Sequence, residues 1–270
     1  MKKLSARRRH PLAVFVVLLI ALAATGGLYT AFAPADEAQA GNTAAQSLAI
    51  EEGDALYQVG CSSCHGRSGE GGSDGPSLVG VGPAAVHFQV GTGRMPMANP
   101  GAQAPEKPRV YTDDEITQLA AFIGSLGPGP AIPDVSAYDP ADGDAARGGE
   151  LFRTNCAQCH NFTGQGGALT HGKFAPELTD VDPIYIYEAM LTGPQNMPSF
   201  PDSVLPEQEK RDIIAWLDAV NTSESPNPGG FSLGGFGPVS EGLFAWTFGI
   251  GALVALTVWI GARSAKARKS

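Results

Sequence analysis

The chain has 270 residues, of which 43% are hydrophobic, and its formal net charge is −9. This length allows one or two domains with packed cores, and the hydrophobic content excludes an intrinsically disordered protein. The two termini hold half of the 18 basic residues and no acid, so the middle of the chain carries all 27 acidic residues. Such an acidic surface repels phosphate groups, which excludes a nucleic-acid-binding function.

The first predicted element is an uncharged run of 22 residues, 12–33, that follows a basic N-terminus. A helix of that length spans a hydrocarbon core of roughly 30 Å, so residues 1–33 are predicted to form an N-terminal transmembrane helix. The alternative is a cleaved signal peptide, with Ala38-Gln39-Ala40 as the cleavage site. Both interpretations place the acidic middle of the chain outside the cytoplasm.

Two similar stretches follow, residues 46–128 and 138–222, which we name the first repeat and the second repeat. A shift of 95 residues aligns their glycine, aromatic and cysteine positions: Gly53 with Gly148, Tyr57 with Phe152, and Cys61 with Cys156. Helical patterns are expected at the start and the end of each repeat, over 50–59, 113–126, 144–153 and 206–220. Strand-like alternation is scarce, so the predicted fold class is all-α, with two tandem domains joined by a linker at 129–137.

All four cysteines lie in two C-x-x-C-H motifs, Cys61-Ser62-Ser63-Cys64-His65 and Cys156-Ala157-Gln158-Cys159-His160. Two thiols about one helical turn apart can each bond to a vinyl group of the same haem, and the adjacent histidine can ligate its iron. The motifs therefore predict two covalently bound haem c groups. They are attached through Cys61, Cys64, Cys156 and Cys159, and His65 and His160 are the proximal ligands.

Three other interpretations of the cysteines stay open at this point. Structural disulfides are common in exported chains, but they leave the histidine after each pair unexplained. A four-thiolate zinc site needs two C-x-x-C pairs, although these two lie much further apart than in zinc ribbons. A thioredoxin-like redox pair is expected in a βαβ context, which the sequence lacks.

The last predicted elements are a Pro/Gly-rich linker over 223–240 and a second uncharged run over 242–262. This run is predicted to form a C-terminal transmembrane helix, with Trp246 and Trp259 near its two ends as interfacial anchors. Because the basic clusters lie at the extreme termini, both termini are expected in the cytoplasm and the repeats on the other side of the cell membrane.

Each repeat resembles a class I cytochrome c domain, which has a helix, C-x-x-C-H, a Gly-Pro-x-Leu-like segment, a Met-Pro pair and a terminal helix, in that order. The resemblance implies a methionine as the second axial ligand of each iron: Met95, with Met97 as its rival, and Met197. It also implies that the carbonyls of Pro76 and Pro176 accept the proximal His N–H, and that aromatic side chains join the first and last helices. A filled sixth site would make each haem an electron carrier.

The whole arrangement resembles the dihaem cytochrome c subunit of the actinobacterial-type cytochrome bc complex, a menaquinol–cytochrome c reductase. In that family the subunit takes electrons from the Rieske iron–sulfur protein, in a complex with cytochrome b, and delivers them to an aa3-type oxidase. The resemblance implies an electron-transfer subunit of a translocase, with no substrate chemistry and no catalytic residue of its own. The C-terminal anchor is the feature that distinguishes this family.

Three alternative functions stay open at this point. A subunit of a cbb3-like oxidase usually carries an N-terminal anchor only, and a dihaem peroxidase needs one haem with an open or displaceable sixth site. A stand-alone electron shuttle would purify without partners. The remaining histidines, His10, His87 and His171, are not assigned as ligands.

Overall fold

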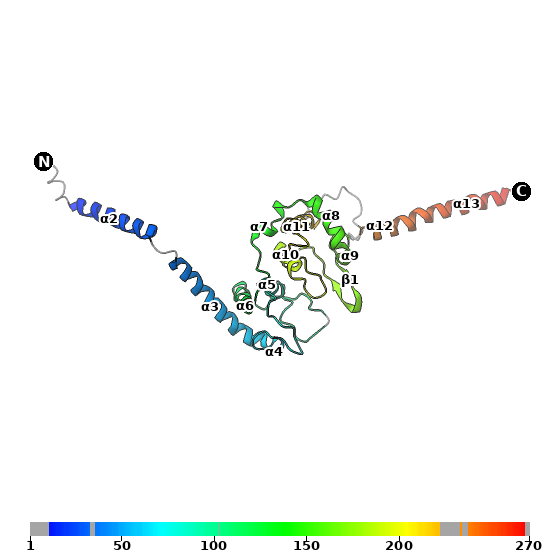
Figure 1. Ribbon diagram of the computed structural model, residues 1–270. Coiled ribbons are helices and arrows are strands. Elements are labelled where there is room, and N and C mark those ends of the chain that lie inside the picture. The colour runs from blue at the N-terminus through cyan, green and yellow to red at the C-terminus, as the bar shows by residue number, and fades with distance from the viewer. Residues whose placement is uncertain (1–10, 33–35, 102, 222–232, 234–236, 268–270) are drawn as a thin grey trace. The chain divides into compact units, whose positions relative to one another are not determined.

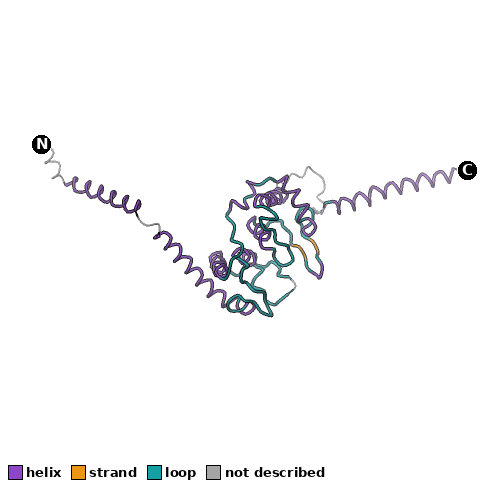
Figure 2. The backbone as a smooth tube through the Cα atoms, in the orientation of Figure 1, coloured by secondary structure: helices purple, strands orange, loops and turns teal. Residues whose placement is uncertain are grey.

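The computed structural model describes residues 11–32, 36–101, 103–221, 233 and 237–267 (Figures 1 and 2). Contacts divide the chain into two compact units, 1–51 and 52–270. The basic residues at positions 2–9, His10 and most of the predicted linker 223–240 lie outside the described residues.

The described chain is mostly helical, as predicted, with one two-stranded antiparallel ribbon of β1 and β2 in which Gly167 pairs with Ala175. The α-helices are α2 Pro11–Phe32, α3 Asp36–Gly60, α4 Ser62–His65, α5 Pro83–Gly91, α6 Asp113–Ser125, α7 Val135–Tyr138, α8 Ala145–Asn155, α9 Ala157–His160, α10 Pro183–Thr192, α11 Glu207–Asn221, α12 Pro238–Phe244 and α13 Gly251–Ala267. The short elements are the 3-10 turns η1 Pro140–Asp142 and η2 Thr170–Gly172, the strands β1 Gly167–Ala168 and β2 Phe174–Ala175, and the π-helical stretch η4 Ala245–Ile250.

The first and last helices of each repeat cross at a glycine. A Cβ atom on Gly53 would collide with the backbone carbonyl of Gln118 in α6, and one on Gly148 with that of Asp212 in α11. Only a residue without a side chain lets the two backbones approach this closely, which explains why glycine recurs at the same place in both repeats.

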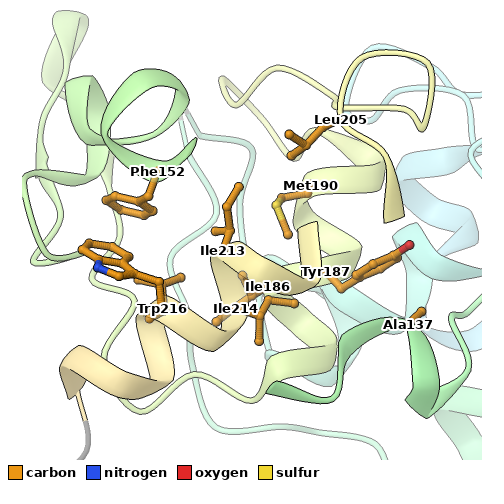
Figure 3. Packing of buried hydrophobic residues seen from close by; sticks show 10 residues of the cluster. Ala137, Phe152, Ile186, Tyr187, Met190, Leu205, Ile213, Ile214 and Trp216 are labelled. Atoms are coloured by element: carbon orange, nitrogen blue, oxygen red, sulfur yellow. The ribbon is translucent and has the colours of Figure 1, made fainter. Parts of the chain in front are cut away.

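An aromatic pair lies beside each glycine crossing, as the resemblance implied. The rings of Tyr57 and Phe122 lie 5.1 Å apart in the first repeat, and those of Phe152 and Trp216 lie 4.5 Å apart in the second. Figure 3 shows Phe152 over Trp216 in the core of the second repeat, with Ile213 from α11 beside them. Tilted pairs at these separations add stability beyond the apolar area that they bury.

Helix α6 begins at a capping box. The Thr112 hydroxyl accepts the backbone N–H of Glu115, and the Glu115 carboxylate accepts the backbone N–H of Thr112. Its buried face consists of Ile116, Leu119, Ala120, Phe122 and Ile123. The helical pattern expected over 113–126 is therefore confirmed, and the helix starts at the expected residue.

Helices α5 and α10 were not predicted, because their sequences are apolar on nearly every side and show no amphipathic period. They pack against each other and so join the two repeats. The contact is centred on His87, whose Nδ1 lies 2.8 Å from Oε1 and 2.9 Å from Oε2 of the fully buried Glu188. Burial raises the pKa of Glu188, and the hydrogen bond from His87 opposes that rise. The Tyr185 ring stacks on His87 at 5.5 Å.

The predicted linker 129–137 is in contact with the first repeat. The Pro130 carbonyl accepts the backbone N–H of Ala84 at 3.1 Å, and Gly129 lies directly against Gly82. The linker ends inside a helix, since α7 begins at Val135.

The C-terminal apolar segment forms a continuous helical run from Pro238 to Ala267. Within the described residues, 238–263 is the one helix that is long and apolar enough to cross a membrane, and its side chains are exposed. The apolar part of α2 covers Leu12–Gly27 and is shorter than such a span, so the N-terminal transmembrane helix stays a prediction.

We expect Glu188→Gln to lower the free energy of unfolding by about 2 kcal/mol, because it removes a buried charged acceptor from His87. Equilibrium denaturation in urea measures the loss. Glu150→Gln, at an exposed position of α8, is the matched control and should change stability by less than about 0.5 kcal/mol. Equal stability of the two variants would contradict a contribution of the His87–Glu188 contact.

Candidate functional site

Each C-x-x-C-H motif forms one helical turn directly after a longer helix. In the first repeat, the backbone N–H of His65 donates to the Cys61 carbonyl at 3.0 Å. In the second, that of His160 donates to the Cys156 carbonyl at 2.9 Å. This turn brings both cysteines and the histidine of each motif to one side of the helix, which is the arrangement that a single haem requires.

A proline carbonyl fixes each histidine ring. His65 Nδ1 lies 2.8 Å from the Pro76 carbonyl oxygen, and His160 Nδ1 lies 2.9 Å from that of Pro176. Because a carbonyl only accepts, Nδ1 carries the hydrogen and the lone pair is on Nε2, the nitrogen that is then free to bind a metal. The predicted proline contacts are therefore confirmed in both repeats.

Glycine-rich loops hold the two prolines in place. The Leu78 N–H donates to the Gly69 carbonyl and the Leu178 N–H to the Gly164 carbonyl, both at 2.7 Å. Gly69 and Gly164 have φ values of +73° and +83°, which side-chain-bearing residues rarely adopt. The shared glycines of the two sequences thus produce the same loop on the same side of the histidine.

The second repeat contains a cavity of about 300 Å³ whose wall includes Cys156, Cys159, His160 and Met197. These are the four residues predicted to hold the second haem, and they come from the junction of α8 and α9, from α9 and from the loop after α10. The rest of the wall is largely apolar, with Phe152, Ile186, Phe200, Ile213 and Leu217 among its residues. A mostly apolar wall with a few convergent ligands is typical of a cofactor site.

The two candidate methionines of the first repeat follow α5. The Met95 N–H donates to the Gln89 carbonyl at 2.9 Å, in the turn that ends the helix. The methyl group of Met97 lies near Gly101. The choice between Met95 and Met97 stays a prediction.

Burial changes the titration of the cysteine and histidine side chains. It raises the pKa of Cys61 to about 11 and that of Cys156 to about 12, and in each case the neighbouring cysteine adds to the rise. Burial also lowers the pKa of His160, although the hydrogen bond to Pro176 opposes this. At neutral pH the Cys61 and Cys156 thiols are protonated and the His160 imidazole is neutral, the form in which it ligates a metal.

The alternative interpretations of the cysteines find no support. All four cysteines are free thiols, with no disulfide between them. Among the residues that the structure describes, no three Cys, His, Asp or Glu side chains converge as metal ligands, so the two pairs do not form a four-thiolate zinc site. The donor set of the second motif fits a haem, with two thiols, one neutral imidazole and a largely apolar wall.

Sequence reasoning missed that the first repeat supplies part of the cavity wall. Phe88, Arg94 and the segment 103–106 line the cavity beside the residues of the second repeat. Two pairs of hydrogen bonds fasten this segment. Gln103 bonds the backbone N–H and carbonyl of Phe174 at 2.9 and 2.7 Å, and Gln195 bonds those of Ala104 at 3.0 and 3.1 Å. The repeat pattern does not indicate these contacts, because they connect positions that are not equivalent in the two repeats.

The other two described histidines lie outside the cavity wall. His87 lies in α5 and bonds Glu188, and His171 is exposed in η2 with a φ of +60°. That neither is a ligand stays a prediction.

The geometry and the repeat define the class of this protein, a cytochrome c. The model of the family "Cytochrome C oxidase, cbb3-type, subunit III" matches residues 48–123 and 143–217, one match in each repeat.

Over nearly its whole length, the chain is similar to a narrower group of proteins within the cytochromes c. A cytochrome bc1 complex cytochrome c subunit of Corynebacterium efficiens is 47% identical over 97% of this chain and 94% of its own length. The subunit of the same description from Mycobacterium tuberculosis is 45% identical over 96% of this chain and 93% of its own length. That of Corynebacterium diphtheriae is 45% identical over 97% of this chain and 99% of its own length. This chain belongs to the family of cytochrome bc1 complex cytochrome c subunits. A FixP subunit of a cbb3-type oxidase from Sinorhizobium medicae is 27% identical over 54% of this chain.

We expect the double variant Cys156→Ser, Cys159→Ser to lose the mass of one haem and to keep the other, because each motif forms its own turn and loop. Intact-protein mass spectrometry and pyridine haemochrome absorbance measure the change. Ser63→Ala, inside the first motif but not a haem-bonding position, should keep the full mass. A double variant that keeps all its haem would contradict the assignment of Cys156 and Cys159.

Proposed function

We propose that this chain is a membrane-anchored dihaem cytochrome c that relays electrons within a cytochrome bc1-type complex. Haem 1 is bound through Cys61 and Cys64, and haem 2 through Cys156 and Cys159. The observation that carries the proposal is the cavity wall of the second repeat, where both thiols, His160 and Met197 meet. The similarity to bc1 complex subunits over nearly the whole chain supports it.

The chain's own residues perform the binding and the tuning. A bound haem supplies one-electron iron chemistry. The Pro76 and Pro176 carbonyls keep each imidazole in the tautomer that ligates through Nε2. The Met197 thioether, a soft ligand, favours the ferrous state and raises the reduction potential. Met95 has the equivalent role for haem 1, and the direction of Met97 toward Gly101 favours Met95 for it.

The membrane segments restrict where the relay works. The apolar helix at 238–263 anchors the chain, and the apolar run at 12–33 provides a second span if it is retained. With basic residues at both termini, the repeats lie on the extracytoplasmic side. Tethering raises the effective concentration of each redox partner, so electron transfer does not depend on diffusion in bulk solution.

The partners that we propose are a Rieske iron–sulfur subunit and cytochrome b in a menaquinol-oxidising translocase, with an aa3-type oxidase as the acceptor. A cbb3-like oxidase subunit is the second candidate, since the family model bears that description and FixP is a distant relative. The anchor after the second repeat and the much higher identity to bc1 complex subunits favour the first candidate. A peroxidase would need an open sixth site, and the presence of Met197 on the cavity wall argues against one.

Purification of the full chain in a gentle detergent, followed by mass spectrometry of the co-purifying proteins, tests the partners. Rieske, cytochrome b and aa3-type oxidase subunits are expected. A cbb3-type catalytic subunit would select the second candidate, and isolation of the chain alone would favour a free shuttle. Material without a c-type haem band after dithionite reduction would reject the proposal.

We expect Met197→Ala to leave haem 2 attached, to lower its reduction potential and to open its iron to carbon monoxide, because a soft ligand is lost. Potentiometric titration and the carbon monoxide difference spectrum measure the change. Met97→Ala is the matched control in the first repeat, and Met95→Ala should alter haem 1 in the same manner. An unchanged spectrum and unchanged ligand reactivity would reject Met197 as a ligand.

A further inference from the structure

Arg94 has an unusual position. It belongs to the first repeat and directly precedes Met95, yet it lines the cavity of the second repeat. Only 8% of the residue is exposed. Arginine is almost never buried to this extent unless it is paired, so the guanidinium requires an anionic partner.

The partners of Arg94 within the described chain are weak for such a buried charge. Its Nη2 lies 3.4 Å from the carboxylate of Glu106, whose side chain is 64% exposed, and its guanidinium carbon lies 4.9 Å from the centre of the Phe88 ring. The first distance exceeds that of a charge-assisted hydrogen bond, and a guanidinium has five N–H donors. The side chain therefore keeps donors for another acceptor.

The location of Arg94 on the wall is fixed by its surroundings. Phe88, under the guanidinium, also lines the cavity, and the segment that begins at Gln103 is fastened to the second repeat by hydrogen bonds of Gln103 and Gln195. Lys173 is the other basic side chain among the described lining residues, and its ammonium donates to Asn196 at 2.8 Å. Arg94 is thus the buried cation that faces this cavity.

We propose that Arg94 binds a propionate of haem 2 and is a positioning residue for electron transfer between the two haems. The proposal rests on the proposed function, because a haem brings two carboxylates into a site whose wall is otherwise largely apolar. Arginine suits this task, since its planar fork can donate two parallel hydrogen bonds to one carboxylate.

Two consequences follow for the relay. A fixed positive charge beside haem 2 disfavours the additional positive charge of the ferric state, so it raises the reduction potential of haem 2. Arg94 and Met95 are also consecutive residues, so a single peptide bond connects the propionate partner of haem 2 with the candidate sixth ligand of haem 1. The first repeat thereby positions haem 2 and provides a short covalent route between the two haems.

Potentiometric titration of Arg94→Gln in the full-length chain tests the proposal. The titration step that moves in Met197→Ala identifies haem 2. We expect the ferrous-to-ferric ratio of haem 2 at a fixed ambient potential to fall about ten-fold, which is about 59 mV for one electron, with haem 1 unchanged. Arg94→Lys keeps the charge and should recover most of the potential. Arg109→Gln is the matched control, since this exposed arginine pairs with Asp113 and should leave both potentials unchanged.

Resonance Raman spectra provide a second readout, because the propionate bending band responds to hydrogen bonding. The band should shift in Arg94→Gln and stay in Arg109→Gln. If Arg94→Gln keeps both haems and shows an unshifted band and an unchanged haem 2 potential, the role of Arg94 is overturned. If the unaltered chain holds no covalent haem, the proposed function is overturned.

If Arg94→Gln does not assemble, the Arg94→Lys variant decides. A propionate band identical to that of the unaltered chain overturns the proposal, and a shifted band supports it.

Discussion

The hydrogen bond from a histidine Nδ1 to a proline carbonyl is the interaction on which each site depends. It requires three features at once: a helical turn that directs the imidazole outward, a glycine-rich loop that returns the chain, and a proline carbonyl aimed at the ring. The two repeats satisfy these requirements with distances of 2.8 and 2.9 Å. Their loops contain glycines at the same positive φ positions, because the alignment of the carbonyl tolerates little variation.

Much of this arrangement was predictable because the constraints are local. Cysteine spacing, the Thr112 capping box and the amphipathic face of α6 each depend on residues within a few positions of one another. The alignment of the two repeats shows the shared glycines Gly53 and Gly148. Only the structure shows the reason for them, which is the close approach of two helix backbones. The site residues of the second repeat were brought together as the motifs indicated.

The contacts between the repeats were not predictable. Helices α5 and α10 are apolar on most sides, so no period marks them, and no motif marks the histidine that joins them. Its partner Glu188 is charged and fully buried, which no composition rule would suggest. Arg94 likewise has no sequence signature beyond its position before Met95. These side chains connect positions that are not equivalent in the two repeats, so the alignment of one repeat with the other does not reveal them.

The glutamine pairs that fasten the segment 103–106 make the two halves of the duplication unequal. Residues of the first repeat form part of the wall of the cavity in the second repeat. A fragment that begins at Val135 would expose that apolar cavity to water and leave the polar backbone groups of Phe174 without the Gln103 side chain. The cavity of the second repeat is therefore complete only when the segment 103–106 of the first repeat lies against it.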